Sequence, residues 1–185
     1  MTGPSPLVYP LAGLLAEPPG ERRIFPIHGA TIPLPDELRL AEPIEGRVEI
    51  ARTNRGVVVD ARLATAIDAA CARCLRDIEV PISVRIEEEV LPSVELTSGL
   101  PIDTSAEPDV SRLTDHHELD LAKLVGEAIS LEEPIAPLCE ADCPGLCPTC
   151  GERLGLGHAG HPADDVDPRL EVLRGFRVDG ADETG

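Results

Sequence analysis

Residues Val57 to Val90 read "VVVDARLATAIDAACARCLRDIEVPISVRIEEEV" and contain the longest regular pattern of the chain. In each half, apolar residues alternate with polar or charged ones, a period of two that is typical of half-buried strands. The sequence "CARC", Cys71 to Cys74, separates the two halves and leaves room for a turn. We therefore predict two antiparallel strands, each with one buried face and one solvent-exposed, acidic face.

A third alternating run lies just upstream, from Ile44 to Ile50, and the turn-forming sequence "TNRG" at 53–56 joins it to Val57. Three such runs in succession predict an antiparallel β-meander. The apolar positions are Ile44, Val48 and Ile50 in the first run, Val57, Val59, Ala61, Leu63, Ile67 and Ala69 in the second, and Ile78, Val80, Ile82, Val84, Ile86 and Val90 in the third.

One main helix is predicted downstream of the meander, after a polar, aperiodic segment at 92–116 that we interpret as a long loop. Asp120 is a suitable cap for this helix, and the helix should end near Glu132 because the residue before Pro134 disfavours helical geometry. The helix should pack on the apolar face of the sheet. Its apolar positions follow helical spacing and are Leu121, Leu124, Val125, Ala128 and Ile129.

These elements predict an α+β fold with three parts. Residues 1–42 form a proline-rich segment that packs on the core, with a short helix or turn at 11–16 and an extended stretch at 23–27. Residues 43–134 form the core of β-meander and helix. Residues 135–185 form a small cysteine-rich, zinc-binding module and a tail with a short helix that begins at Pro168.

The charge of the chain restricts its partners. It has 34 acidic and 16 basic side chains, a net charge of -18, no Trp, one Tyr and two Phe among 185 residues. Phosphate backbones repel such a chain, and it offers few aromatic rings on which bases could stack. Extensive direct nucleic-acid binding is therefore disfavoured, and a basic protein is the expected partner.

Two features of the sequence predict a cytoplasmic protein. The N-terminus lacks the basic region of a secretory signal, and no window approaches the 18 or so apolar residues of a membrane helix. In a reducing compartment, clustered cysteines indicate a metal site before a disulfide.

Six cysteines are the candidate metal ligands: Cys71, Cys74, Cys139, Cys143, Cys147 and Cys150. A C-x-x-C knuckle directs two thiolates to one point, and four thiolates around zinc form a closed site that stabilises structure. The sequence slightly favours a local tetrad of the last four cysteines. A tetrad that joins Cys71 and Cys74 to Cys147 and Cys150 stays open, as does a variant that uses Cys139 and Cys143 instead. Iron–sulfur ligation also suits the spacing.

The sequence predicts no catalytic residues. His158 and His161 lie in the glycine-rich stretch "GLGHAGHPADD" and are expected to be solvated loop histidines rather than replacement ligands. The "CARC" motif is followed by a strand pattern, whereas a thioredoxin-type pair opens a helix. The chain contains no P-loop, G-x-G-x-x-G or G-x-S-x-G motif.

Several motifs together carry a family resemblance. "CARCL", the helical "ELDLAKLVGEAISLEEPIAPLC", "CEADCPGLCPTCG", the N-terminal "LLAEPPGERR" and the closing "DPRLEVLRGF" resemble the YceD family of large ribosomal RNA subunit accumulation proteins. The resemblance implies a bacterial cytoplasmic protein needed for normal accumulation of large-subunit ribosomal RNA. It also implies frequent genetic linkage to a small, basic protein of the large ribosomal subunit.

The sequence and the resemblance together lead us to expect a non-enzymatic ribosome-biogenesis factor. We expect a structural zinc site and an acidic surface for a basic ribosomal protein or a large-subunit precursor particle. The first alternative is direct binding of ribosomal RNA through the zinc module, where Arg73, Arg76 and Arg153 lie near the cysteines. The second alternative is a zinc-dependent or thiol redox enzyme.

Overall fold

The computed structural model describes residues 7–35, 38–103, 105, 107–155, 157–158, 161, 169 and 173. The chain divides into two compact units. The larger unit comprises Met1–Ala72 and Arg76–Cys139, and the smaller comprises Arg73–Leu75 and Glu140–Gly185. All the helices and strands named below belong to the larger unit.

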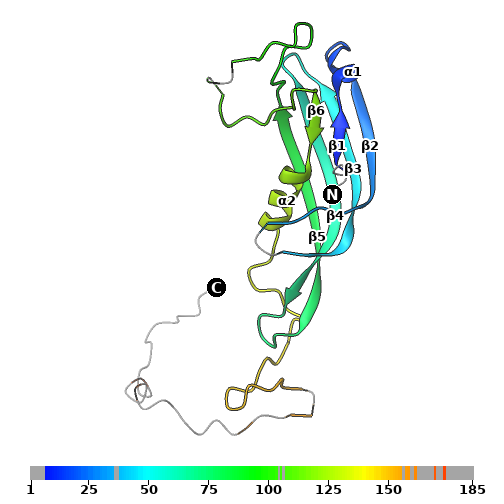
Figure 1. Cartoon of the computed structure of the whole chain (residues 1–185). Helices are drawn as coiled ribbons and strands as arrows, with labels where there is room; N and C mark the ends of the chain where they lie inside the picture. Colours follow the sequence, from blue (N-terminus) through cyan, green and yellow to red (C-terminus); the bar gives the residue numbers. More distant parts are fainter. Residues whose placement is uncertain are drawn as a thin grey trace, which may run out of the picture. The chain divides into compact units, whose positions relative to one another are not determined.

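The larger unit is built on a four-stranded antiparallel sheet in the order β2-β3-β4-β5, shown in Figure 1. The strands are β2 (Arg22–Ala30), β3 (Leu40–Arg52), β4 (Val57–Ala70) and β5 (Asp77–Val90). The three-strand meander predicted from the alternating sequence is therefore confirmed as β3, β4 and β5. The extended stretch predicted at 23–27 lies in β2, which pairs along β3 and makes the meander a four-stranded sheet.

Alternation along the strands decides which face of the sheet is buried. Val59, Ala61 and Leu63 of β4 are buried and share their face with Val84 and Ile86 of β5, directly across the pair. Each fully buried aliphatic side chain of this kind contributes about 1.5–3 kcal/mol. The core is almost entirely aliphatic, and its aromatic part is Tyr9 with Phe25 packed against it.

Gly46 allows β3 to approach β4 closely. Its φ of 151° is one that other residues rarely adopt, and a Cβ atom there would lie 2.2 Å from the backbone oxygen of Arg62. The register between β3 and β4 is irregular just before this point, between Leu40 and Glu42 and between Glu42 and Glu45. Gly46 stands two residues after Ile44 in the alternating run, but the structure shows that lack of a side chain is what the position requires.

Short elements complete the larger unit. They are β1 (Val8–Pro10), α1 (Ala12–Leu15), β6 (Glu118–Asp120) and α2 (Ala122–Leu131), and β1 pairs with β6 in a second, two-stranded sheet. The sequence did not reveal β1 and β6, because strands of three residues show no period. The described part of the chain thus contains two short helices in a mostly antiparallel β fold.

Helix α2 occupies the region in which the helix was predicted and contacts β5. Val125 and Ile129 on its apolar side are fully buried. Asp120 was predicted as its cap, but the N-cap position is Leu121, and the Asp120 carboxylate instead accepts a hydrogen bond from the Ala122 N–H at 2.9 Å. The acidic group still satisfies one of the unpaired N–H groups of the first turn, from one residue further upstream.

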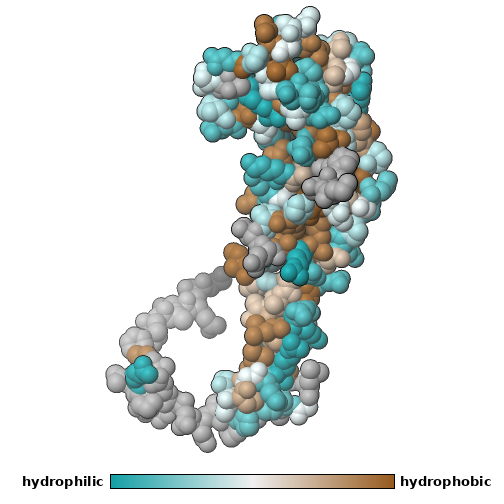
Figure 2. Space-filling model, in the orientation of Figure 1, coloured by the Kyte–Doolittle hydropathy of each residue, from teal (hydrophilic) through white to brown (hydrophobic). Residues whose placement is uncertain are grey.

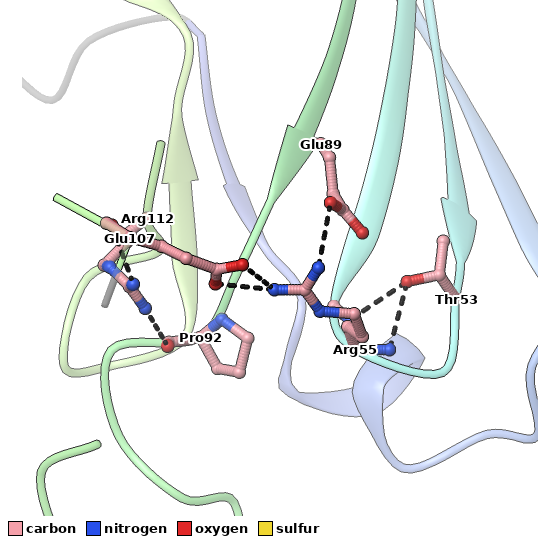
Figure 3. Close-up of polar contacts among 7 residues, drawn as sticks. Thr53, Arg55, Glu89, Pro92, Glu107 and Arg112 are labelled. Atoms are coloured by element: carbon pink, nitrogen blue, oxygen red, sulfur yellow. Dashed lines mark hydrogen bonds and ion pairs between the residues drawn. The ribbon is translucent and has the colours of Figure 1, made fainter. Parts of the chain in front are cut away.

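The segment 92–116 contains no helix or named strand among its described residues, as predicted, but polar contacts hold its path (Figure 3). Arg55, in the turn between β3 and β4, donates to Glu107 at 2.5 Å and lies 3.9 Å from Glu89. Arg112 donates to the backbone oxygens of Pro92 and Glu107. The loop is therefore attached to the sheet through arginine side chains.

No helix among the described residues is long and apolar enough to cross a membrane. The short helix predicted from Pro168 falls outside the described residues, apart from Arg169 and Leu173.

Candidate metal centre

The hairpin loop between β4 and β5 carries the first cysteine pair. The last strand pair is Ala70 with Asp77, and the Cys71 N–H then donates to the Arg76 oxygen at 2.8 Å, which closes the loop. Leu75 has a φ of 55°, a left-handed conformation in which the chain reverses. Cys71 and Cys74 are 0% and 6% exposed. The loop therefore directs both thiols inward.

Cys139 reaches this loop through the segment that follows α2. The Ala72 N–H donates to the Pro137 oxygen at 2.8 Å, two residues before Cys139. Strand pairing in the sheet and this hydrogen bond thus bring together two segments that are far apart in the sequence.

In the smaller unit, residues 145–154 form a tight hairpin that carries Cys147 and Cys150. The Cys147 N–H donates to the Glu152 oxygen at 2.7 Å, and the Gly151 N–H donates to the Cys147 oxygen at 2.8 Å. Gly151 has a φ of 74°, which explains the glycine that directly follows Cys150. This geometry is the knuckle that the "CPTCG" sequence predicts, with both cysteines on one side of a chain reversal.

Arginine side chains hold Arg73–Leu75 in place within the smaller unit. The Arg153 guanidinium donates to the backbone oxygens of Cys74 and Leu75 at 2.9 and 3.1 Å. Arg73 donates to the Cys143 oxygen at 3.1 Å. Both guanidinium groups therefore neutralise carbonyl dipoles near the cysteines, a structural role that the sequence alone did not indicate.

The described residues contain two groups of side chains that could hold a metal ion. The first group is Cys71, Cys74, Cys139 and Cys143, and the second is Cys147, Cys150, His158 and His161. Within each group the ligand atoms all lie within 4.8 Å of one another. Four sulfur atoms around a tetrahedral zinc are about 3.8 Å apart, so a small inward movement of the side chains would complete either site.

The first group consists of sulfur alone, and three of its four cysteines are buried. Four thiolates fill the coordination of a zinc ion and leave no position for a substrate. The donor set therefore fits a closed, structural metal site.

The second group combines two thiols with two imidazoles and is more open. Cys147 is buried, whereas Cys150 and His161 are exposed. The Cys150 Sγ lies 3.3 Å from the His158 Nε2, close to the roughly 3.5 Å that separates sulfur and nitrogen ligands of a tetrahedral zinc. The rings of His158 and His161 are 5.2 Å apart. Two thiols and two imidazoles form a donor set that is common in structural zinc sites.

The surroundings of Cys147 favour its thiolate form. A hydrogen bond from the His158 side chain, followed by the backbone N–H groups of Cys150 and His161, lowers the pKa of the Cys147 thiol to about 5, against a smaller opposing effect of burial. The thiolate is the form that binds a metal, so the knuckle prepares this residue for ligation.

These groupings change the assignment that the sequence favoured. The local tetrad of Cys139, Cys143, Cys147 and Cys150 is not brought together. Instead, Cys139 and Cys143 group with Cys71 and Cys74 of the "CARC" motif. This grouping is the variant that the sequence left open. A physical reason lies at Gly145, whose φ of 79° turns the chain between Cys143 and Cys147.

The sequence reasoning also undervalued His158 and His161. We expected solvated loop histidines, but both lie beside the cysteines of the knuckle. The sequence feature that could have identified them is the H-x-x-H spacing shortly after a C-x-x-C knuckle. Together the two motifs offer two cysteine and two histidine ligands within one short stretch. His28 in β2 lies 3.1 Å from Glu45 of β3 and belongs to neither group.

Comparison with known proteins places these residues in a family. The family model described as "Large ribosomal RNA subunit accumulation protein YceD" matches residues 59–177, a range that contains both groups. Uncharacterized proteins of Mycobacterium tuberculosis (strain ATCC 25618 / H37Rv) and Mycobacterium bovis are each 33% identical over 126 residues, covering 68% of this chain and 58% of theirs.

A Mycobacterium leprae protein, also uncharacterized, is 29% identical over the same length and is covered to 55%. The chain thus matches less than two thirds of the length of these relatives. No solved structure matches it.

Proposed function

The chain belongs to the YceD family of large ribosomal RNA subunit accumulation proteins, and on this basis we propose that it is a non-enzymatic ribosome-biogenesis factor. It supports the accumulation of large-subunit ribosomal RNA in the bacterial cytoplasm. A structural zinc ion stabilises its cysteine-rich part, and its acidic surface binds a basic ribosomal protein or a precursor particle of the large subunit.

The single observation that carries this proposal is the family match over residues 59–177. The matched range includes most of β4, all of β5 and α2, and all six cysteines, so the likeness covers part of the sheet as well as the candidate metal ligands. The net charge of -18 supports a basic protein partner over nucleic acid, since the phosphates of RNA would be repelled.

The chemistry of the two ligand groups supports a role without catalysis. Each group provides four protein ligands, and a catalytic zinc keeps a position open for water or substrate. When bound, zinc would supply cross-links between chain segments. Cys71 and Cys139 would hold the hairpin loop to the segment after α2, and Cys147 with His158 would close the stretch after the knuckle.

Direct RNA binding through the cysteine-rich part has less support. Two of the three arginines that could contact phosphates, Arg73 and Arg153, already donate to backbone oxygens. RNA affinity measured against salt concentration separates the two functions. A phosphate-binding protein loses affinity with a slope of about -0.7 in log units per contact on single strands, whereas the proposed function predicts no measurable binding.

Deletion of the gene in the cell of origin tests the proposal. We expect the ratio of large-subunit to small-subunit ribosomal RNA to fall and precursor particles to accumulate in a sucrose gradient. A plasmid copy of the wild-type gene should restore both. An unchanged ratio in the deletion strain, with unchanged particle profiles, would contradict the proposed function.

A further inference from the structure

Large apolar side chains are exposed on the larger unit at the end of β5 that follows the hairpin loop. Leu131, the last residue of α2, is 85% exposed, and Ile135 is as exposed as in an extended chain. Leu138 is 37% exposed. Soluble proteins expose single apolar residues often, but several large ones in a short segment mark an interaction site.

The sheet contributes to the same surface. Ile78 and Val80 continue the apolar row of β5, yet they are only partly buried, whereas Ile82 further along the strand is 4% exposed. The cause is the end of α2 at Leu131, beyond which the apolar row loses its helical cover. The segment after the helix covers that row only in part, since Ile78 and Val80 stay half-buried.

A shallow pocket joins the two sides of this surface. Its lining comes from β5 and from the segment after α2, namely Ile78, Glu79, Val80, Pro81, Pro134, Pro137, Leu138 and Cys139. We call Ile78, Val80, Leu131, Ile135 and Leu138 the apolar patch. Figure 2 shows apolar side chains exposed along this part of the molecule, below helix α2.

Carboxylates border the apolar patch. Asp77 and Glu79 on β5 and Glu132 and Glu133 after α2 are all exposed, and none has a side-chain hydrogen bond or ion pair to a described residue. At the other end of β5 the situation differs, because Arg55 lies beside both Glu89 and Glu107 (Figure 3). Among the described residues, no ion pair like that of Arg55 with Glu89 or Glu107 is formed by these four carboxylates.

We propose that the apolar patch docks a short basic segment of a partner protein, one that carries large apolar side chains flanked by Lys or Arg. The apolar side chains would fill the pocket beside β5, and the cations would pair with the four carboxylates. The inference rests on the proposed function and deepens it, because it assigns a surface to the basic partner.

Charge complementarity selects this occupant over a second copy of the chain. Two copies, each with a net charge of -18, would bring like carboxylates together around the patch. A basic segment instead gains both burial of apolar area and attraction at the rim. The charge should also accelerate association and make it sensitive to salt.

A synthetic peptide tests the apolar contribution. The probe is a fluorescently labelled amphipathic peptide of Lys and Leu, and a Glu and Leu peptide of the same pattern serves as the reversed-charge control. The triple variant L131S/I135S/L138S should weaken binding of the Lys/Leu peptide by at least about tenfold, because each lost contact removes apolar burial.

A matched variant controls for general loss of surface hydrophobicity. Leu96, Leu100 and Ile102 in the 92–116 loop are also exposed, and the triple change L96S/L100S/I102S should alter the affinity by less than about twofold. Thermal unfolding of both variants establishes that each is folded. Equal weakening in the two variants would overturn the patch as the docking site.

A second pair of variants isolates the charges. E132Q/E133Q and E17Q/E21Q change the net charge equally, and the four side chains are all exposed. Only E132Q/E133Q should weaken the peptide and flatten its salt dependence. Amide shifts of the ¹⁵N-labelled chain should concentrate around Ile78, Val80 and Ile135 when peptide is added; shifts elsewhere would overturn the assignment.

Two further outcomes separate this inference from its premise. A dimer in sedimentation that is lost in L131S/I135S/L138S would overturn the proposal in favour of self-association. If the variant binds peptide normally while the deletion strain loses large-subunit RNA, the patch is wrong and the proposed function stands. If the patch binds peptide and the deletion strain is normal, the proposed function is wrong and the patch stands.

Discussion

The two ligand groups differ in how the chain brings four candidate metal ligands together. The first gathers four cysteines from the hairpin loop and from the segment after α2, and three of the four are buried. The second takes all its ligands from one stretch, 147–161, and includes an exposed cysteine and an exposed histidine. One therefore depends on tertiary structure and the other on local chain geometry.

This difference predicts different energetic roles. A metal in the first group would cross-link segments that the sheet and α2 bring together. Its loss would therefore lower the stability of the whole fold. A metal in the second group would order a short stretch beyond the knuckle. The first should then determine stability, and the second should exchange its metal without unfolding the sheet.

The largest effect is expected from loss of a buried thiolate. Cys71→Ser should lower the free energy of unfolding by more than about 4 kcal/mol, because a structural metal contributes to folding directly. Chemical denaturation measures the free energy, and elemental analysis measures the metal content. Cys150→Ser in the second group is the matched control and should cost less than about half as much.

A larger effect of Cys150→Ser than of Cys71→Ser would contradict the energetic roles assigned to the two groups. If Cys150→Ser destabilises the chain more than Cys71→Ser, the exposed group carries the structural metal. Equal and small effects of both substitutions, with unchanged metal content, would contradict metal binding at either group.

Chelation should separate the two groups by rate. A chelator should remove metal from the second group at least about tenfold faster than from the first, because exposed ligands need no opening of the core. Substitution with Co²⁺ allows each site to be followed, since four-sulfur and mixed sulfur–nitrogen sites absorb differently. A single common rate, or a single spectrum of four-sulfur type, would contradict two distinct sites.

The same contrast explains what the sequence could predict. The meander followed from period-two alternation, because each half-buried strand repeats its signal along more than ten residues. The Cys147–Cys150 knuckle followed from local spacing and from the glycine at 151. Such features need only neighbouring residues, so one sequence suffices to find them.

The division of the cysteines into two groups could not be predicted from local sequence spacing. The partnership of Cys71 with Cys139 depends on where β4 ends and where the segment after α2 returns, and spacing along the chain does not contain that information. His158 and His161 were missed for another reason. Their glycine-rich surroundings are typical of solvated loops, and the proximity of His158 to Cys150 is visible only in three dimensions.

The histidines offer a milder way to test the second group. His158→Ala should remove one metal equivalent and change the free energy of unfolding by less than about 1 kcal/mol, because a ligand is lost from the surface without a cavity in the core. His116→Ala is the matched control, since His116 is exposed and belongs to neither group. If the His158 variant retains all bound metal, His158 is not a ligand and is a solvated loop histidine, as the sequence suggested.

Two glycines of the cysteine-rich part allow a matched test of backbone strain. Gly145 and Gly151 have nearly the same φ, 79° and 74°, so alanine should cost about 1–2 kcal/mol of strain at each. Their surroundings differ: a Cβ at Gly145 would lie 3.3 Å from the Arg73 oxygen, whereas at Gly151 no atom of the described residues lies within 4 Å. Gly145→Ala should therefore destabilise the chain more than Gly151→Ala and reduce metal content, because it disturbs Arg73, which holds the Cys143 carbonyl. Chemical denaturation and metal analysis of both variants measure the difference. Equal effects of the two substitutions would show that only backbone strain acts and that the contact of Gly145 with Arg73 does not support the first ligand group.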